Sequence, residues 1–560
     1  MTRRGRRITC GTTYEATTRT MKTRWGFPDS GMLRALLVLS FTAVSCSSLR
    51  TDAVKPASHA IEPQSNVAAA YQVGARPAPD DGRSGFRLLI DSVGALMSRI
   101  ALADHAKHTI DLQYYIFNND ATGRLVAQRL LAAADRGVRV RMLLDDLDAA
   151  PAAQLIDALD VHPNIEVRLF NPFLTRNPSL LSKIGQFMID GRRLNRRMHN
   201  KSYIIDNTVA IVGGRNIGDA YFDADEKLRF RDLDVIAVGP VVDATSKAFD
   251  AYWNSDSAYP VTAFASTKAT EEDLAHTRIT LYHEARAFAQ SEYAAALPSD
   301  FPRTAATDRK GEWFWGKAIL LADSPEKVTP GNDDEALRMQ PEIDALINGA
   351  RQSVLMISAY FVPGTKGTRY FIDLASRGVA VKLFTNSLAS SDAPPVHAGY
   401  SRYRRRLIEG GVEIYELRPA ATQPAQAKSR GPSGSGGGPS SGLAPSTSPL
   451  SLHAKALVVD GRYVFVGSMN MDARSKVLNT EMGVVVDSPE MAAATEAFFD
   501  NATRPENAFH VVLDPNGRGL RWLAVDEQGH PVRYDNEPHA SFWRRVEVSL
   551  ISLLPIDGLL

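Results

Sequence analysis

The chain has 560 residues, of which 44% are hydrophobic and 23% are charged, so it has room for two to four globular domains with a large core. The formal net charge of +1 argues against a protein that coats nucleic acid with its whole surface, although local basic patches stay possible. The two cysteines are Cys10 and Cys46, and cleavage of the chain before Cys46 would leave one cysteine and no disulfide.

Residues 1–46 are predicted to be a leader. An apolar run from Ala35 to Val44 follows basic residues and precedes Ser45 and Cys46, which is the layout of a secretory signal. The run is shorter than the roughly 20 residues that a membrane-spanning helix needs. Ala43 to Cys46 resembles a bacterial lipobox, in which the cysteine is lipidated. This resemblance implies a protein of the bacterial cell envelope, membrane-associated through Cys46 and facing the extracytoplasmic side. A plain cleaved signal and an uncleaved anchor are the alternatives.

Residues 47–85 are rich in Ala, Pro, Ser and Asp without an apolar period, which predicts a disordered tether. An internal repeat follows, because the pattern of residues 101–145 returns at 345–385. Each copy is expected to form a helix, strand, helix, strand unit with a glycine, Gly137 or Gly378, at the corner before the second strand. We therefore predict an α/β fold with two similar lobes, 86–258 and 336–505, each a mixed, mostly parallel sheet flanked by helices.

Three further segments lie between the lobes, within lobe 2 and after it. Residues 259–335 are expected to connect the lobes and to cover the core. Residues 422–449 are a Gly, Ser and Pro low-complexity stretch, which predicts a disordered insertion in lobe 2. Residues 506–560 form a C-terminal extension with a hairpin-like run and a helix beginning at Phe542. That helix either packs on lobe 2 or lies among lipid headgroups at a membrane surface.

Two copies of one short pattern carry the chemistry. Met198–Asp206 and Leu452–Asp460 both read His-x-Lys-x4-Asp, and a small-residue cluster ending in Asn follows each copy. Residues two apart on a strand share a face, so His199 lies beside Lys201, and His453 beside Lys455. Two-residue turns centred on 207–208 and 461–462 would place Asn216 opposite His199 and Asn470 opposite His453.

These motifs resemble the HKD motif of the phospholipase D superfamily, whose members join two similar lobes so that both motifs meet in one active site. The resemblance implies a pseudo-two-fold fold with the site between the lobes. Three segments, 211–222, 392–415 and 467–475, look more specifically like bacterial cardiolipin synthases of the C type. This implies transfer of a phosphatidyl group from a phospholipid to phosphatidylglycerol. The expected partners are phosphatidylglycerol, possibly phosphatidylethanolamine, and a membrane surface, with no nucleic acid.

The residue types suit a phosphodiester. Lys201 and Lys455 would hold the non-bridging oxygens, and Asn216 and Asn470 would donate further hydrogen bonds. One histidine can attack phosphorus while the other protonates the leaving alcohol. The resemblance makes His199 the nucleophile, although the spacing does not decide between the two.

Supporting roles fall to four acidic residues. Asp234 and Glu481 are aligned with the carboxylate that orients the histidine in the family. Asp206 and Asp460 lie at the turns and are assigned structural hydrogen bonds within the hairpins. We expect no metal or other cofactor, because each histidine is paired with a cationic lysine, a poor ligand.

Other readings remain open. The same site could use water, as a phospholipase D or another phosphodiesterase, and a catalytically silent lipid-binding lipoprotein is an alternative of another class. The histidines could also be ordinary buried strand residues, although two complete motifs argue against that. A run of four arginines before His199, at 192, 193, 196 and 197, is either a solvated face or a site that gathers anionic headgroups.

Overall fold

The computed structural model describes residues 53–62, 81–175, 179–225, 227–264, 269–295, 312–332, 334–419, 450–517 and 519–554. These residues belong to one compact unit, Leu49–Leu560. The expected leader with Cys46, the insertion at 422–449 and most of the tether lie outside the described residues. Among the helices of the described part, none is both long and apolar enough to cross a bilayer.

Lobe 1 is a mixed sheet with helices on both faces. Across the sheet the strands run in the order β1, β8, β6, β5, β2, β3, β4, β9, and β2, β3 and β4 are parallel. The strands are β1 (Ser84–Leu89), β2 (Thr109–Tyr114), β3 (Arg139–Asp145), β4 (Ile165–Phe170), β5 (Ser202–Ile205), β6 (Val209–Gly213), β8 (Asp234–Val238) and β9 (Ala258–Pro260). The helices are α3 (Ser92–His105), α4 (Ala121–Asp135), α5 (Ala153–Leu159), α6 (Leu180–Leu194), α7 (Pro240–Trp253), α8 (Glu271–Ala289) and α9 (Glu292–Ala295).

Lobe 2 repeats this plan. Its strands run in the order β17, β16, β15, β11, β12, β13, β18, β19, β20, and β11, β12 and β13 are parallel. The strands are β11 (Ser353–Ser358), β12 (Ala380–Asn386), β13 (Glu413–Leu417), β15 (Lys455–Val459), β16 (Tyr463–Gly467), β17 (Met482–Asp487), β18 (Ala508–Leu513), β19 (Leu520–Val525) and β20 (Pro531–Tyr534). The helices are α11 (Gln340–Asn348), α12 (Gly364–Ser376), α13 (Pro394–Glu409), α14 (Pro489–Ala502) and α15 (Phe542–Ile551).

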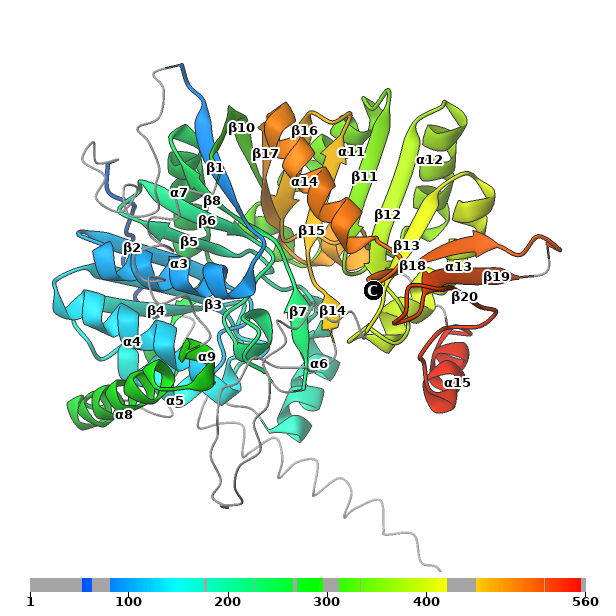
Figure 1. The fold of residues 1–560 in the computed structure, drawn as a ribbon. Coiled ribbons are helices and arrows are strands. Elements are labelled where there is room, and N and C mark those ends of the chain that lie inside the picture. The colour runs from blue at the N-terminus through cyan, green and yellow to red at the C-terminus, as the bar shows by residue number, and fades with distance from the viewer. Residues whose placement is uncertain are drawn as a thin grey trace, which may run out of the picture. The chain divides into compact units, whose positions relative to one another are not determined.

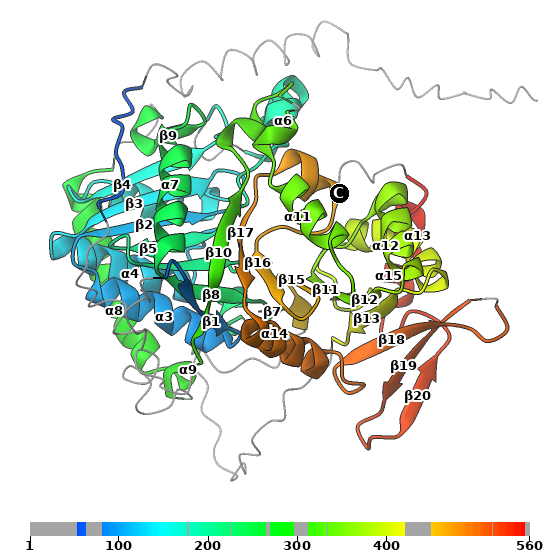
Figure 2. The ribbon, with the colours of Figure 1, turned by 90° about the horizontal axis from the view of Figure 1, so that it is seen from above.

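Strand β10 (Phe314–Ala322) joins the two sheets into one. Its first residues pair with β1 of lobe 1, and residues from Lys317 onward pair with β17 of lobe 2. Figure 1 shows β10 between the lobes, with lobe 1 on the left and lobe 2 on the right, and Figure 2 shows the same junction from above. The predicted connecting segment therefore supplies a structural strand as well as α8 and α9.

Buried apolar side chains explain the layering. One core cluster joins α3, α4 and α5 to the sheet of lobe 1, and a second cluster lies between α11, α12, α13 and the sheet of lobe 2. A central cluster contains side chains of both lobes, such as Trp253 on α7 and Phe499 on α14. The predicted corner glycines, Gly137 and Gly378, have φ angles of 89° and 86°, a conformation that favours glycine.

The tether prediction is wrong for residues 53–62, which lie against lobe 1. The carbonyl of Ser58 accepts a hydrogen bond from Arg141 at 2.8 Å, and the carbonyl of Pro56 accepts one from Arg168 at 2.6 Å. Both guanidinium groups are buried, and they need acceptors in addition to their carboxylate partners. The backbone carbonyls of this segment supply those acceptors. Its amino-acid composition alone does not predict this contact.

Candidate active site

A small cross-lobe sheet positions the two histidines. Strand β7 (Arg229–Arg231) of lobe 1 pairs in parallel with β14 (Leu450–Leu452) of lobe 2. The backbone N–H of His453 donates to the carbonyl of Arg231 at 2.8 Å. On the equivalent side, the N–H of His199 donates to the carbonyl of Thr480 at 2.9 Å. Each histidine is thus held by backbone from the opposite lobe.

The histidine side chains are also paired across the lobes. Nδ1 of His199 lies 2.8 Å from a carboxylate oxygen of Glu481, and Nδ1 of His453 lies 2.5 Å from Oδ2 of Asp232. All four side chains are buried or nearly so. Because Nδ1 is occupied in each ring, Nε2 is the nitrogen left for chemistry. The two motifs therefore form one site between the lobes.

The prediction for Asp234 is wrong, and Asp232 takes its place. Asp234 forms ion pairs with Arg99 at 2.9 Å and Arg215 at 3.3 Å, inside lobe 1. The strand registers explain the difference of two residues, since Gly213 pairs with Asp234 whereas Gly467 pairs with Gly483. Asp232 is therefore the counterpart of Glu481. Glu481 lies against Nδ1 of His199, and its role in orienting that ring stays a prediction.

The residues beside the carboxylates fit their different lengths. A Cβ atom on Gly214 would lie 2.2 Å from Oδ1 of Asp232, so the close approach requires glycine. The equivalent residue in lobe 2 is Ser468, whose hydroxyl donates to Glu481 at 2.5 Å. Glycine makes room for the short carboxylate, and serine holds the longer one.

Lys201 and Lys455 lie in the site and are almost completely buried. Each ammonium group donates to the backbone carbonyl of the histidine two residues earlier, at 2.6 Å for Lys201. Burial lowers the pKa of both lysines, and the carboxylates of Glu481 and Asp232 act in the opposite direction. An anionic ligand would favour the charged form of both.

The two asparagines are arranged differently. Asn216 donates from Nδ2 to the hydroxyl of Tyr221 at 2.8 Å and accepts from the N–H of Ile116 at 3.1 Å. Asn470 is buried, and the atom placed as Oδ1 has no partner among the described residues. A turn of the carboxamide by about 180° would exchange this oxygen for the NH₂ group, so the position can accept or donate a hydrogen bond. Asn470 is the asparagine with spare hydrogen-bonding capacity.

The hairpin register differs by one residue from the prediction in both lobes. Ile205 pairs with Val209, and Val459 pairs with Tyr463, so each turn has three residues and not two. Asp206 and Asp460 begin these turns with φ angles of 52° and 53°. The histidines lie before β5 and β15, so neither faces its asparagine as a paired strand residue.

The side chains of Asp206 and Asp460 accept backbone hydrogen bonds, but not within their hairpins as predicted. Asp206 accepts from three successive backbone N–H groups at 107–109, at 2.7 to 2.9 Å. Asp460 accepts from the N–H groups at 351–353 in the same way. Each aspartate therefore ties its turn to the start of a neighbouring parallel strand, and neither contacts the histidine pair.

The pKa values of the site are asymmetric. Burial and the nearby lysines lower the pKa of His199 well below its usual value. The pKa of His453 is also lowered by burial, but the Asp232 carboxylate opposes that shift. Burial raises the pKa of Glu481 to about 7, whereas the His453 and Lys455 side chains keep the pKa of Asp232 below its usual range. Asp232 is thus the firmly ionised member of the two carboxylates.

Aromatic rings surround both histidines. The ring of Tyr115 meets His199 edge-on with centroids 5.1 Å apart, and Tyr221 meets His453 in the same way at 5.2 Å. Phe230 lies 5.0 Å from His453. The sequence analysis missed these rings and Asp232. The segment Arg231–Asp234 contains two aspartates, and the sequence alone did not show which of them faces His453.

Most of the arginine run before His199 is engaged within the protein. Arg197 is buried in an ion pair with Asp145 at 2.7 Å, and Arg193 binds Asp190 and Asn171. Arg196 donates to the carbonyl of Lys327 at 2.9 Å. Arg192 is the exposed member.

The two repeated lobes, the paired HKD motifs and the single site between them define the phospholipase D fold with a complete site. A family model described as "Cardiolipin synthase, PLD-like domain" matches residues 100–253 and 343–503. The chain belongs to this family.

Known proteins agree with this assignment. Cardiolipin synthase C of Escherichia coli (strain K12) is 40% identical over 481 residues, which cover 86% of this chain and 97% of that protein. An uncharacterised protein of Helicobacter pylori (strain ATCC 700392 / 26695) is 34% identical and covers 84% of this chain and 88% of its own length. The crystal structure of phosphatidylserine synthase from Haemophilus influenzae Rd KW20 matches with a TM-score of 0.53 at 13% identity, over 86% of this chain and 96% of that one. This last likeness concerns the fold.

Proposed function

We propose that the protein transfers a phosphatidyl group from one phospholipid to the glycerol headgroup of phosphatidylglycerol, forming cardiolipin. The observation that carries the proposal is the pair of cross-lobe contacts, His199 with Glu481 and His453 with Asp232, beside two buried lysines. The 40% identity to a cardiolipin synthase along most of the chain supports the same conclusion.

His199 is the nucleophile in this scheme. Its lowered pKa leaves the imidazole neutral at pH 7, and its Nδ1 is occupied by Glu481, so Nε2 attacks phosphorus. A nitrogen–phosphorus bond forms while the phosphorus–oxygen bond to the departing headgroup breaks. The product of this step is a phosphatidyl group carried on His199.

His453 is the acid and then the base. The ionised Asp232 carboxylate favours the imidazolium form of His453, so Nε2 can give its proton to the departing alkoxide. The neutral ring then removes a proton from the hydroxyl of the second phosphatidylglycerol. That oxygen attacks phosphorus, the bond to His199 breaks, and both histidines return to their starting states.

Lys201, Lys455 and Asn470 stabilise the negative charge on the non-bridging oxygens. The two ammonium groups are already in place in a buried site, where an interaction with a phosphate is stronger than in water. The Oδ1 atom of Asn470 has no partner among the described residues, and a turn of this carboxamide by about 180° would present its NH₂ group there as a donor to a non-bridging oxygen. Asn216 has a positioning role, because its amide is bonded to Tyr221 and Ile116.

The envelope location is also a proposal. Both substrates are lipids, so an enzyme held at a membrane meets them more often than one in free solution. We infer that lipidation of Cys46 anchors the protein to the bacterial envelope on its extracytoplasmic side. Labelling of cells with a fatty-acid analogue tests this, with Cys46→Ser as the variant that loses the label.

The product identifies the acceptor. Purified protein is incubated with vesicles of labelled phosphatidylglycerol, with and without phosphatidylethanolamine, and the lipids are separated. Cardiolipin as the main product supports the proposal. Phosphatidic acid without cardiolipin would show that water is the acceptor and that the protein is a phospholipase D. No turnover by the intact protein would favour the silent lipid-binding alternative.

A further inference from the structure

Helix α6 (Leu180–Leu194) turns its apolar side to the solvent. Five of its side chains form one arc of the helix, since they recur at spacings of three and four residues. These side chains are Leu180, Leu181, Ile184, Phe187 and Met188, and their exposed fractions are 74%, 82%, 49%, 37% and 83%. Surface helices of globular proteins normally face their apolar stripe toward the core. Within the described part of the chain the apolar arc of α6 therefore faces the solvent, apart from the ring of Phe187, which meets Phe173 edge-on at 5.9 Å.

The opposite side of α6 attaches to the protein through polar contacts. Gln186 is buried and bonds to the N–H of Leu174 and to the hydroxyl of Thr175. Arg193 donates to Asn171 at 2.7 Å. These specific bonds hold the helix with its polar side inward, so the exposure of the apolar arc is built into the fold.

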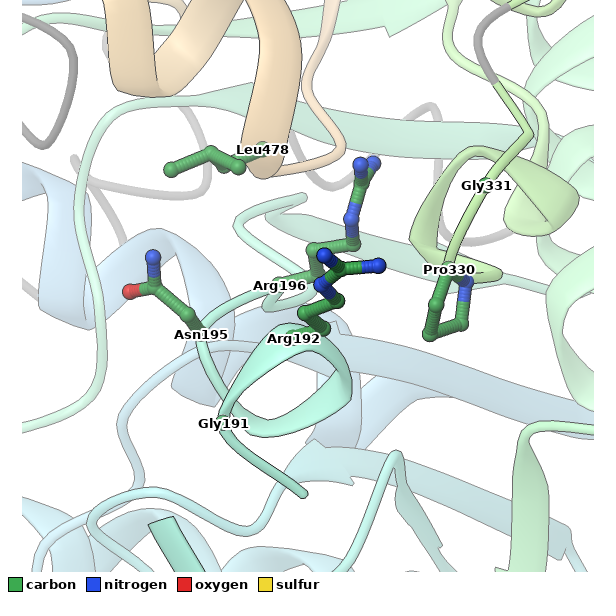
Figure 3. A pocket seen from close by; sticks show the side chains of 7 residues that line it. All are labelled: Gly191, Arg192, Asn195, Arg196, Pro330, Gly331 and Leu478. Carbon is green, nitrogen blue, oxygen red and sulfur yellow. The ribbon is translucent and has the colours of Figure 1, made fainter. Parts of the chain in front are cut away.

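The C-terminal end of α6 forms one wall of a pocket of about 390 Å³. The pocket is lined by Gly191, Arg192, Asn195, Arg196, Pro330, Gly331 and Leu478. Figure 3 shows the side chains of Arg192 and Arg196 extending into the same space between Asn195 and Pro330. In the described part of the chain the side chain of Arg192 has neither a hydrogen bond nor an ion pair with another residue. Positive charge is thus placed directly beside the apolar arc.

The pocket is close to the catalytic residues in the chain and in space. His199 follows Arg196 by three residues, and Asn195 at the pocket wall accepts a hydrogen bond from Arg474 at 2.8 Å. Arg474 lies near enough to His199 to lower the pKa of that ring. A lipid held at this pocket would therefore lie beside the active site.

A second helix with exposed apolar side chains belongs to lobe 2, where Val548 on its other side is buried with Leu388 and Ala398. On α15 the side chains of Phe542, Trp543 and Leu550 are 68%, 76% and 62% exposed. The other side of α15 is fixed by Arg544, which donates to the carbonyls of Leu388 and Ser391. Figure 1 shows both α6 and α15 projecting on the lower side of the molecule, one from each lobe.

We propose that α6 docks the enzyme on an anionic phospholipid surface, with its apolar arc among the acyl chains and an anionic headgroup at Arg192. Exposed apolar side chains next to cationic ones match the two layers of such a surface, acyl chains and phosphates. A second copy of the chain is a less suitable partner for this surface. If two copies met through their α6 helices, the positive pocket of one copy would face the positive pocket of the other. Like charge would therefore oppose that contact.

Site-specific depth labelling tests the docking. In the full chain with Cys10→Ser and Cys46→Ser, Met188→Cys carries an environment-sensitive fluorophore, and Ile319→Cys on β10 is the control. Ile319 is 56% exposed and belongs to β10, a strand that Figure 1 shows on the upper side of the molecule, away from α6. With phosphatidylglycerol vesicles carrying a quencher on the acyl chain, we expect quenching at position 188 and none at 319. A label at 188 that stays in water on bound protein would overturn the proposal. So would a label that becomes buried without vesicles as protein concentration rises.

Vesicle sedimentation tests the two contributions separately. In the same Cys10→Ser and Cys46→Ser background, which has no lipidated cysteine, Leu181→Ser with Met188→Ser should weaken binding to phosphatidylglycerol vesicles by about tenfold or more. The reason is that two apolar side chains lose their place in the bilayer. Arg192→Ala should weaken it by about fivefold, and the difference should vanish on phosphatidylcholine vesicles. Ile319→Ser should bind like the wild type. Equal binding by all variants would refute the docking role of α6.

The outcome can be separated from the proposed reaction. With dissolved short-chain phosphatidylglycerol, Leu181→Ser with Met188→Ser should keep its rate, whereas its rate on vesicles should fall together with binding. A fall on both substrates would assign α6 to the fold or the active site and reject docking. If the wild type forms no cardiolipin on either substrate, the proposed function fails, but the depth labelling still decides on the membrane contact.

Discussion

The cross-lobe pair of His453 and Asp232 makes a sharp prediction about Asp232→Asn. The side chain is buried, its Oδ2 lies 2.5 Å from Nδ1 of His453, and its Oδ1 accepts from the N–H of Leu233 at 2.8 Å. Asparagine keeps the size but removes the charge that favours the protonated ring. Loss of one general acid typically costs ~100 to 10,000-fold in rate. We expect kcat to fall within that range while the fold remains intact.

The pH dependence of activity should change in a defined direction in Asp232→Asn. Asp232 raises the pKa of His453, so its loss lowers that pKa further. The reaction needs the protonated ring for the departing headgroup, and activity therefore declines as pH rises through the pKa of His453. In Asp232→Asn this alkaline decline should move to lower pH. The measurement is kcat/KM for short-chain phosphatidylglycerol across the pH range, together with the unfolding temperature.

Asp234→Asn is the matched control, two residues away and equally buried. It disturbs the ion pairs with Arg99 and Arg215. Breaking a buried ion pair typically costs about 3–5 kcal/mol of stability. We expect a lower unfolding temperature and an unmoved pH profile. The reasoning is refuted if Asp234→Asn shifts the profile and Asp232→Asn leaves it unchanged.

Three further predictions follow from the same structure. Gly214→Ala should reduce kcat nearly as much as Asp232→Asn, because the added Cβ atom would displace the Asp232 carboxylate. A normal rate would show that this carboxylate can move aside without loss of activity. Lys201→Met should retain the fold by thermal unfolding but lose at least about 100-fold in kcat/KM, since an oriented charge on the developing oxyanion is removed; rates near wild type would exclude that role. Asp460→Ala should lower stability by about 1–3 kcal/mol in urea unfolding, because the N–H groups at 351–353 lose their acceptor, with little change in kcat.

The sequence was sufficient for the lobes and for most of the site. The repeat around Gly137 and Gly378 predicted the parallel strands, and the resemblance of the twin motifs to the HKD motif implied that His199 and His453 meet in one site. The strand pattern of the repeat and the spacing within each motif could be read from the sequence, because both concern residues that are neighbours along the chain. The family resemblance added the phospholipid chemistry.

The errors at the site share one physical cause, which is strand register. Asp206 opens a three-residue turn with positive φ, and this moves the hairpin by one residue. Gly213 pairs with Asp234, which sends that aspartate into lobe 1 and leaves Asp232 facing the other lobe. Pairing between strands is settled by packing across the whole sheet, so two nearby carboxylates could not be ranked from the sequence.

The central claim is that both motifs act on one phosphorus atom, with His199 as the nucleophile. Rapid quenching of His453→Ala with labelled phosphatidylglycerol, followed by peptide mapping, tests it most directly. The slow acid–base variant should accumulate the label as a phosphatidyl group on the peptide that contains His199, and His199→Ala should carry none. A label on His453 in the wild type, or equal labelling of His199→Ala, would contradict the account.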